Sequence, residues 1–338
     1  MRLLLIGFGT VGQGLAELIL EKKNELKQTY DLELEVIGIS DKLKGSIIGP
    51  EGIDLDKILE KAGKGSSLGN GSGSFKGDAL EMIGQAGADV MVEATYTDIQ
   101  TGEPAASHIR AALKKGMHVV TSNKGPVALH YQELKKSAAE NRVKFLFEGT
   151  VMSGTPVINL LEDCMAGSRV KEIRGILNGT TNYILTRMEE GLSYEQALKK
   201  AQELGYAEAV PEADVEGRDA LAKVTILAKV FMDAQENPFD FPCRGITGIS
   251  SRSIMDALER NRRCKLIGRV WEEGGRARAA VAPEEVEMSH PLAGVRGAAN
   301  ALTITTDTLG DVTITGPGAG RRETGFSLLA DLIKICRT

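Results

Sequence analysis

Cysteine and histidine are scarce in this chain and widely scattered. The 338 residues contain four cysteines and four histidines, with no Cys-x-x-Cys pair and no histidines at the spacing of metal ligands. A zinc enzyme and a Ser-His-Asp hydrolase are therefore disfavoured, and any chemistry must come from other side chains. The scattered cysteines indicate reduced structural thiols, and the sequence leaves open whether Cys336, almost at the C-terminus, has a redox role.

Long apolar runs and a strong excess of one charge are also lacking. The apolar run after Arg2 breaks at Gly7, which is too short for a signal peptide, and no stretch approaches the length of a membrane span. The formal net charge is −5, so there is no electrostatic reason to expect nucleic acid or an acidic membrane as a partner. We therefore expect a cytoplasmic protein with neither partner.

The first residues have the pattern of a dinucleotide-binding unit. Residues 2–6 predict a short buried strand, and apolar residues at helical spacing begin at Val11. The glycine motif between them consists of Gly7, Phe8, Gly9, Thr10, Val11 and Gly12. In such a motif the first glycine makes a tight turn, the second lets the backbone approach a pyrophosphate, and the third allows close helix packing. We expect these six residues to bind NAD or NADP at the helix N-terminus.

The end of the second predicted strand bears on the choice between the two cofactors. This strand, residues 34–40, is followed by Asp41 and Lys42. A carboxylate at this point usually binds the ribose hydroxyls of NAD, whereas Lys42 could pair with the 2′-phosphate of NADP. The sequence leaves the preference open, with a slight lean towards NADP.

Strands and helices alternate in most of the remaining first half. The Gly/Ser-rich stretch 44–77 comes first and predicts a mobile surface loop, because its composition leaves little apolar surface to bury. Beyond it we expect strands at 89–94, 118–121 and 143–147 and helices at 103–115 and 127–141. This alternation predicts βαβ units and a parallel sheet.

Polar residues follow two of these strands. Thr95 comes after the first, and Ser122, Asn123 and Lys124 come after the second. Because ligands bind outside the carboxyl ends of parallel strands, we expect these four residues to surround the nicotinamide ribose and a reacting carbonyl. For Lys124 the alternative is a solvated lysine at the start of a helix.

The second half predicts a substrate domain with antiparallel strands at 170–177, 262–271, 276–281 and 302–315, joined by Glu-Gly-Gly and Leu-Gly-Asp turns, the second of which lies within 302–315. A separate sheet of this kind is often a dimer surface. After the first strand, Gly179 and Thr180 open a helix whose N-terminus suits a substrate carboxylate, with plain capping as an equal alternative. The glycine-rich turn around Gly318 precedes a helix at 323–335, and we expect this tail to return to the nucleotide domain and close over the cofactor.

The stretch 205–231 places an acid and an amine at the entrance to a buried helix. Asp219 and Lys223 stand four residues apart and face the same way, and from Val224 the helix is apolar on nearly every side. A surface ion pair worth about 0.3–0.5 kcal/mol is the alternative. The pair by itself does not decide between structure and chemistry.

Six motifs, in order along nearly the whole chain, together resemble the homoserine dehydrogenase family. They are GFGTVG at 7–12, TSNK at 121–124, EGTVMSGTP at 148–156, GILNGTTNYIL at 175–185, GYAE with EADVEGRDALAK within 205–223, and ITGPGAG at 314–320. The resemblance implies NAD(P)-linked interconversion of L-homoserine and L-aspartate 4-semialdehyde, on the route to threonine and methionine, by a homodimer. The expected α/β subunit has a Rossmann-type doubly wound parallel sheet (1–147 and 316–338) plus an α+β substrate and dimerisation domain (148–315).

The resemblance also implies roles for individual residues. Lys223 would exchange a proton with the substrate oxygen, and Asp219 would orient it. Lys124 matches a second active-site lysine, and Glu208 with Asp214 would bind the substrate ammonium. An alkoxide that develops as an aldehyde takes up hydride can be stabilised and protonated by an ammonium group.

Further implications concern a cation, chain length and the competing functions. In some relatives the main chain at the positions of Glu148, Val151, Ser153 and Thr155 binds a monovalent cation, here Na⁺. Many relatives carry a kinase or C-terminal regulatory domain, whereas this chain ends at Thr338 after its closing helix, so we expect the short form without threonine feedback. A dehydrogenase of another small amino acid and a non-catalytic NAD(P)-sensing protein are the alternatives.

Overall fold

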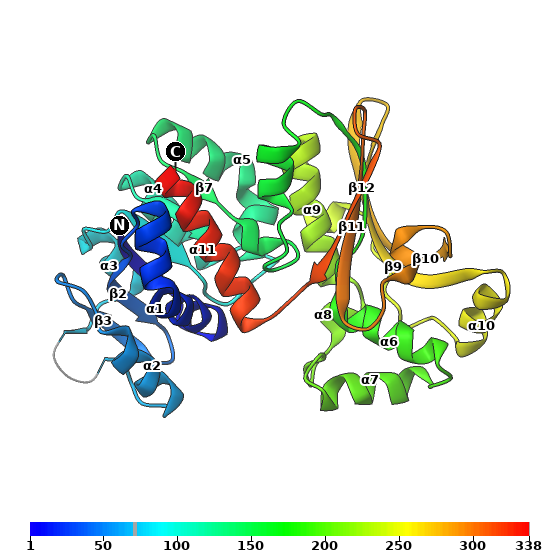
Figure 1. Cartoon of the computed structure of the whole chain (residues 1–338), viewed down its shortest axis with the longest axis horizontal. Coiled ribbons are helices and arrows are strands. Elements are labelled where there is room, and N and C mark those ends of the chain that lie inside the picture. The colour runs from blue at the N-terminus through cyan, green and yellow to red at the C-terminus, as the bar shows by residue number, and fades with distance from the viewer. Residues whose placement is uncertain (70–72, 338) are drawn as a thin grey trace. The chain divides into compact units, whose positions relative to one another are not determined.

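The computed structural model describes residues 1–69 and 73–337 and divides into two compact units (Figure 1). One unit is Met1–Ile158 with Gly320–Thr338, and the other is Asn159–Ala319. The boundaries thus fall at 159 and 320, where the sequence suggested 148 and 316. The segment 148–158 stays with the first unit because it is bonded to the last helix: the Glu148 N–H donates to Asp331 Oδ2 at 2.9 Å, and the Ser153 and Thr324 hydroxyls are 2.6 Å apart.

The first unit contains the predicted parallel sheet. Its strand order is β4-β3-β2-β1-β5-β6-β7. The parallel strands are β1 (Arg2–Ile6), β2 (Glu35–Asp41), β5 (Val90–Glu93), β6 (His118–Thr121) and β7 (Phe145–Leu146). Central strand β1 is almost wholly buried, as expected for a strand covered on both faces. Leu3 and Leu5 belong to the core cluster that includes Leu15 and Leu328, whereas Leu4 lies beside Gly38 on the opposite face, close to Met82.

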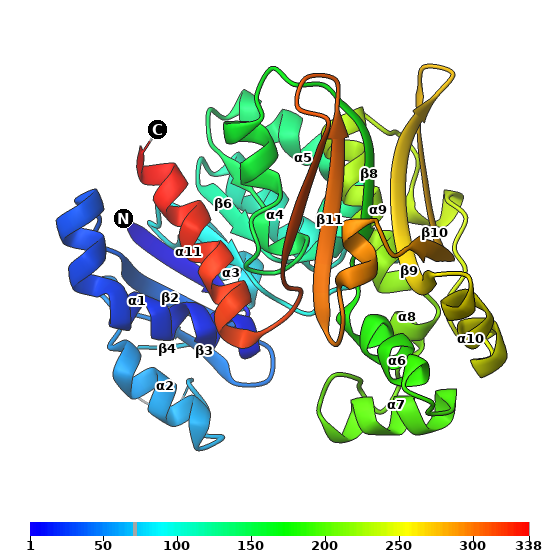
Figure 2. The ribbon, with the colours of Figure 1, turned by 45° about the vertical axis from the view of Figure 1, so that its right-hand side comes forward.

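Helices cover both faces of this sheet. They are α1 (Thr10–Tyr30), α2 (Leu55–Gly63), α3 (Ala79–Gln85), α4 (Ala105–Lys114), α5 (Lys124–Glu140) and α11 (Arg321–Arg337). Figures 1 and 2 both show α1 and α11 side by side. Their backbones touch, since a Cβ on Gly14 would lie 2.2 Å from the Arg321 carbonyl oxygen and a Cβ on Gly325 would lie 2.7 Å from Gly14. The end of the chain therefore completes the nucleotide-binding layer.

The prediction of a mobile loop at 44–77 is wrong for the part that the structure describes. Residues 70–72 of that stretch lie outside the described residues, and the rest contains β3 (Gly45–Ile48), helix α2 and β4 (Ser74–Phe75). The two strands extend the sheet in antiparallel fashion beyond β2. The composition gave the wrong prediction because the stretch also contains a few apolar residues that are buried in the main core, namely Leu55, Ile58 and Leu68.

The second unit is built on a five-stranded antiparallel sheet of order β10-β9-β8-β11-β12. The strands are β8 (Val170–Ile176), β9 (Arg262–Glu273), β10 (Arg276–Glu287), β11 (Ala299–Thr306) and β12 (Asp311–Pro317). Its α-helices are α6 (Gly179–Glu189), α7 (Tyr194–Glu203), α8 (Glu212–Val215), α9 (Arg218–Met232) and α10 (Ser251–Glu259). Every strand expected from the sequence is present, and β9 and β10 extend further because they form one long hairpin through Gly274 and Gly275, both with positive φ.

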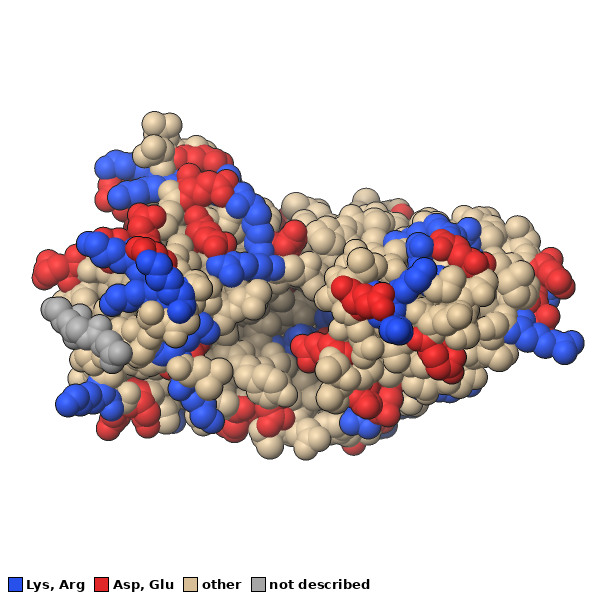
Figure 3. Space-filling model, turned by 90° about the horizontal axis from the view of Figure 1, so that it is seen from below, with Lys and Arg blue, Asp and Glu red and all other residues tan. Residues whose placement is uncertain are grey.

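Charge is mixed on the face shown in Figure 3, where acidic and basic side chains alternate over the surface. Ion pairs between helix neighbours, such as Lys22 with Glu25, also occur among the described residues. Among the described residues, no helix is both long enough and apolar enough to cross a membrane.

Candidate active site

The glycine motif joins β1 to α1 in the predicted strand-turn-helix geometry. Gly7 has φ +94°, and a Cβ there would lie 2.4 Å from the Ala94 carbonyl oxygen. A Cβ on Gly12 would lie 2.5 Å from the Gly7 oxygen, whereas a Cβ on Gly9 would meet nothing within 4 Å. The first turn of α1, starting at Thr10, has neither a side-chain cap nor an acidic residue. Space beside Gly9 at an uncapped helix N-terminus suits a phosphate.

Asp41 ends β2 and is bonded to the glycine loop. Its Oδ2 accepts a hydrogen bond from the Phe8 N–H at 2.8 Å, and its Oδ1 accepts from the Leu43 and Lys44 N–H groups at 3.0 and 2.9 Å. Burial by itself would raise the pKa of Asp41, but these three main-chain donors outweigh it and lower the pKa. Asp41 is thus held as a carboxylate beside the loop, and its neighbour Lys42 is exposed.

The carboxyl ends of β5 and β6 bring the predicted polar residues together. Asn123 Nδ2 donates to the carbonyl oxygens of Thr95 and Tyr96 at 3.3 and 3.1 Å. Its Oδ1 accepts from the Gly125 N–H at 3.2 Å and so caps α5, whose first residue is Lys124. Ser122 lies against Gly149. The structure therefore places Thr95, Asn123 and Lys124 at one edge of the sheet, just after the neighbouring strands β5 and β6.

The acid and the amine on α9 form a pair in which Lys223 is buried and Asp219 is partly exposed. Lys223 Nζ donates to Asp219 Oδ2 at 2.7 Å and to the Leu177 carbonyl oxygen, at the end of β8, at 2.6 Å. The Lys223 residue is 7% exposed. An ion pair at this depth is not a solvated helix-surface pair. Lys223 is thus held in one orientation by two acceptors from different elements.

Asn178 connects this pair to the N-terminus of α6. Its Nδ2 donates to Asp214 Oδ1 at 2.7 Å and to Asp219 Oδ2 at 3.0 Å, and its Oδ1 caps the helix by accepting from the Thr181 N–H at 2.9 Å. Sequence reasoning identified the helix start but not this bridging role. The available signal was an asparagine between a strand end and a helix start that is followed by hydroxyl residues.

Thr180 and Asp214 belong to the same cluster. The Thr180 hydroxyl lies 2.5 Å from the Tyr206 carbonyl oxygen and 3.3 Å from Asp214 Oδ2. Burial raises the pKa of Asp214, and the nearby charge of Asp219 adds to the effect, against the hydrogen bonds from Asn178 and Thr180 and the charge of Lys223, which offset it only in part. A cation bound beside these two carboxylates would relieve their repulsion. The cluster therefore favours a positively charged ligand group.

Glu208 and Gly179 are the other residues predicted for the substrate site. Glu208 lies exposed between α7 and α8, where its carbonyl oxygen accepts from Gln202 Nε2 at 3.1 Å. The described contacts of the Asp214 and Asp219 cluster do not include its carboxylate. Gly179 packs tightly, since a Cβ there would lie 2.6 Å from the Ala298 carbonyl oxygen.

The remaining predicted site residues are Gly318 and those of the loop around Glu148. Gly318 belongs to the second unit, where a Cβ would lie 2.2 Å from the buried Asn300 amide. In the first unit, Glu148 Oε1 accepts from the Val157 and Ile158 N–H groups at 2.6 and 3.1 Å. The loop between them is buried, including Val151, Ser153 and Thr155, and both Met152 and Ser153 have positive φ. No group of three or more His, Cys, Asp or Glu residues suited to a metal occurs within residues 1–69 and 73–337.

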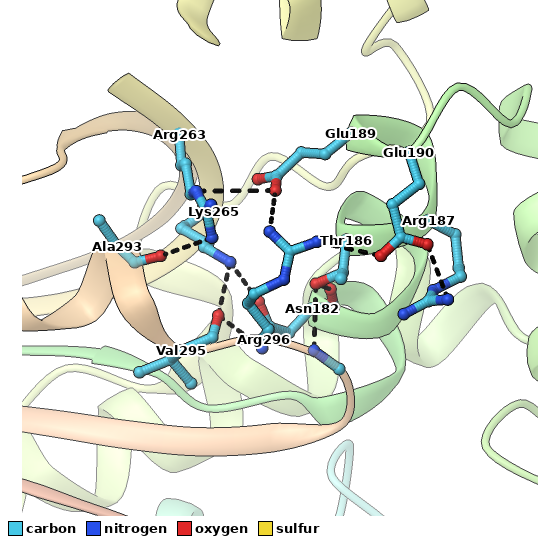
Figure 4. A network of polar contacts seen from close by, with 11 residues as sticks. Asn182, Thr186, Arg187, Glu189, Glu190, Arg263, Lys265, Ala293, Val295 and Arg296 are labelled. Atoms are coloured by element: carbon cyan, nitrogen blue, oxygen red, sulfur yellow. Dashed lines mark hydrogen bonds and ion pairs between the residues drawn. The ribbon is translucent and has the colours of Figure 1, made fainter. Parts of the chain in front are cut away.

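A buried lysine on β9, Lys265, is hydrogen-bonded to α6 (Figure 4). Lys265 on β9 is fully buried, and its Nζ donates to Asn182 Oδ1 at 3.0 Å and to the Val295 carbonyl oxygen at 2.6 Å. Asn182 Nδ2 also donates to the Ala299 oxygen at 3.1 Å. Burial lowers the pKa of Lys265 to about 8, and the charges of Arg263 and Arg296 act in the same direction against Glu189.

This lowered pKa predicts a pH-dependent contribution of Lys265 to stability. The cost of the buried ammonium is present at and below pH 8 and is relieved as pH rises towards the ordinary value of 10.5. We expect the free energy of unfolding of the native protein, relative to Lys265→Met, to rise by on the order of 3 kcal/mol over that range. Urea unfolding at pH 7 to 10.5 measures it, with the exposed Lys171→Met as control. If the free energy of unfolding changes with pH in the same way for the native protein and for Lys265→Met, the prediction is contradicted.

Comparisons with known proteins identify the family of this chain, and the matches cover nearly all of its residues. The family model described as homoserine dehydrogenase, NAD binding domain, matches residues 7–148, and the model described as homoserine dehydrogenase matches residues 156–333. The chain belongs to the homoserine dehydrogenase family. It is an NAD(P)-dependent oxidoreductase that interconverts L-homoserine and L-aspartate 4-semialdehyde, as the motifs predicted.

Individual relatives match over almost their entire length. The NAD(+)-dependent homoserine dehydrogenase of Pseudomonas canavaninivorans is 46% identical, with 99% of this chain and 96% of the relative covered. That of Methanocaldococcus jannaschii is 40% identical, with 99% and 98% covered. A hyperthermophilic archaeal homoserine dehydrogenase solved in complex with NADPH is 34% identical, with a TM-score of 0.83 and 99% and 97% covered.

Proposed function

We propose that Lys223 is the proton donor and acceptor of the homoserine dehydrogenase reaction. When the aldehyde of aspartate 4-semialdehyde is reduced, negative charge develops on its oxygen, and an ammonium group can stabilise that charge and then protonate it. The observation that carries this role is the pair of buried Lys223 with Asp219, 2.7 Å apart, in which Lys223 Nζ also donates to the Leu177 carbonyl oxygen. Asp219 orients the ammonium group, and in homoserine oxidation the proton moves in the opposite direction.

The substrate's amino and carboxylate groups are assigned to the cluster around α6. Asp214, with a pKa raised by burial and by Asp219, gains from a cationic partner, so it binds the substrate ammonium. Glu208, exposed on the adjoining loop, is proposed as the second acid for that group. Gly179 and Thr180 at the N-terminus of α6 suit the substrate carboxylate.

NAD or NADP fits the first unit, because the space beside Gly9 at the uncapped start of α1 is open. The remaining cofactor contacts are proposed to come from the glycine motif, Asp41 with Lys42, the strand-end residues Thr95, Ser122 and Asn123, and Gly318. The nicotinamide, when bound, donates or accepts the hydride. Lys124 is proposed to act beside it as a second active-site lysine.

A steady-state assay tests the substrate assignment. Oxidation of L-homoserine, L-aspartate and related amino alcohols is measured with NAD and with NADP in turn. We expect kcat/KM to be highest for L-homoserine by a wide margin. Equal turnover of another small amino acid would contradict the proposed binding site, and binding of cofactor without any turnover would contradict the role of Lys223.

Removal of the Asp41 carboxylate is expected to shift the cofactor preference towards NADP. A negative charge near the ribose repels a 2′-phosphate, so Asp41→Ser should raise the ratio of kcat/KM for NADP to that for NAD by about tenfold. The ratio is informative because loss of the bond to the Phe8 N–H affects both cofactors. Lys42→Ser is the matched control and should change the ratio in the opposite direction. An unchanged ratio in both variants would place the ribose elsewhere.

A monovalent cation, Na⁺, is proposed to bind the buried loop with Glu148, Val151, Ser153 and Thr155. Support comes from the consecutive left-handed residues Met152 and Ser153, a costly conformation that clusters at ligand-binding loops. Comparing activity in Na⁺ and tetramethylammonium buffers tests the site, and equal activity would argue against it.

A homodimer is proposed through the open face of the antiparallel sheet. That face carries half-buried charged and aromatic residues, including Arg174 bonded to Glu284 and Arg269 stacked 4.7 Å above the Trp271 ring centroid. Sedimentation equilibrium distinguishes dimer from monomer. The lean towards NADP and the cytoplasmic location stay predictions.

A further inference from the structure

Glu93 is a fully buried carboxylate at the carboxyl end of β5, directly below the edge assigned to the cofactor. Its Oε1 accepts hydrogen bonds from both the N–H (3.3 Å) and the hydroxyl of Thr95. A buried carboxylate is costly unless several donors satisfy it. Here two of the donors belong to a single residue that is proposed to contact the cofactor.

Three chain segments meet around this carboxylate. The Thr121 hydroxyl, on β6, lies 2.9 Å from the Glu93 carbonyl oxygen and 3.4 Å from Oε2, and it accepts from the Asn123 N–H at 3.0 Å. The segment after Glu93 packs against the glycine motif, since a Cβ on Gly7 would lie 2.7 Å from the Thr95 nitrogen. A shift of Thr95 would therefore also displace the glycine motif and the end of β6.

The charge of Glu93 has little direct compensation among the described residues. The imidazole of His108, on α4, is 6% exposed, and its Nδ1 lies 3.6 Å from Glu93 Oε1. This distance is too long for a hydrogen bond, and the Nδ1 atom has no hydrogen-bond partner. An amide in place of the carboxylate keeps one acceptor oxygen and turns the other into an N–H group, although the Thr121 hydroxyl donates towards Oε2. The carboxylate thus accepts from Thr95 and Thr121 at once.

We propose that Glu93 is a positioning residue that sets the geometry of Thr95 and Asn123 for cofactor binding. It acts through these two residues and not on the substrate. The inference rests on the proposed cofactor site, in which Thr95 contacts the cofactor.

Glu93→Gln tests this role in the full-length protein. We expect the dissociation constant for NADH or NADPH, measured by nucleotide fluorescence, to rise by about tenfold, as for the loss of one or two buried hydrogen bonds. The KM for L-homoserine should change by less than about twofold. Asp78→Ala, which removes the cap of α3 at a distance from the edge, controls for a general loss of stability and should leave cofactor affinity unchanged.

Thr95→Val separates failure of the inference from failure of the proposed site. If Thr95→Val leaves cofactor affinity unchanged, the proposed site is wrong and the inference falls with it. If Thr95→Val weakens cofactor binding while Glu93→Gln lowers only the melting temperature, the site stands and the role of Glu93 is overturned. If Glu93→Gln does not fold, Glu93→Asp is measured in its place. This variant keeps the carboxylate but withdraws it by one methylene, and its dissociation constant for NADH or NADPH is compared with that of Thr95→Val in the same way.

Discussion

Lys223→Ala is expected to lower kcat for L-homoserine by roughly a thousandfold, the typical effect of removing a general acid–base group. The ammonium group of Lys223 is bonded to Asp219 at 2.7 Å, which holds it ready to give up or take up a proton. Because the residue belongs to the second unit and the glycine motif to the first, the dissociation constant for NADPH should hardly change. Steady-state kinetics together with nucleotide titration measure both quantities.

Lys229→Ala provides the matched control on the same helix. Lys229 is also buried, 5% exposed, and burial lowers its pKa, but it is not bonded to the acid cluster. It should lose stability without a comparable loss of kcat. A similar fall in kcat for both variants would mean that the Lys223 effect comes from damage to α9 and not from lost proton transfer.

Gly9→Ala is expected to weaken cofactor binding on the order of a hundredfold, because an added methyl group occupies the space through which the pyrophosphate approaches the main chain. The same methyl group meets nothing within 4 Å in the protein itself. The free energy of unfolding should therefore change by less than about 1 kcal/mol. Isothermal titration with NADPH and urea unfolding measure the two effects separately.

Gly7→Ala is the contrasting variant. Its methyl group would lie 2.4 Å from the Ala94 carbonyl oxygen, at a residue with φ +94°, so it should cost about 3 to 5 kcal/mol of stability. If Gly9→Ala also unfolds the protein, or if it binds NADPH like the native chain, the assignment of Gly9 to phosphate approach is incorrect.

Local patterns predicted the elements that depend on neighbouring residues alone. The glycine motif, the strand at 118–121 and the Asp219–Lys223 pair follow from chain spacing, since turn geometry and helix periodicity are short-range properties. The prediction for the stretch 44–77 was wrong because it rested on the glycine and serine content of the stretch. Its structure depends instead on the packing of Leu55, Ile58 and Leu68 into the main core.

By itself the sequence determined the fold class, the family through its ordered motifs, and the candidate residues on each element. Only the tertiary structure decided which of them share hydrogen bonds. Asn178 joins Asp214 to Asp219 across 36 and 41 residues, and Glu93 reaches Thr121 across 28. Such contacts depend on how strands and helices pack, and no local spacing encodes them. That is why the roles of Asn178 and Glu93 came from the structure, whereas Lys223 was a candidate from its helix and gained its expected role from the family resemblance.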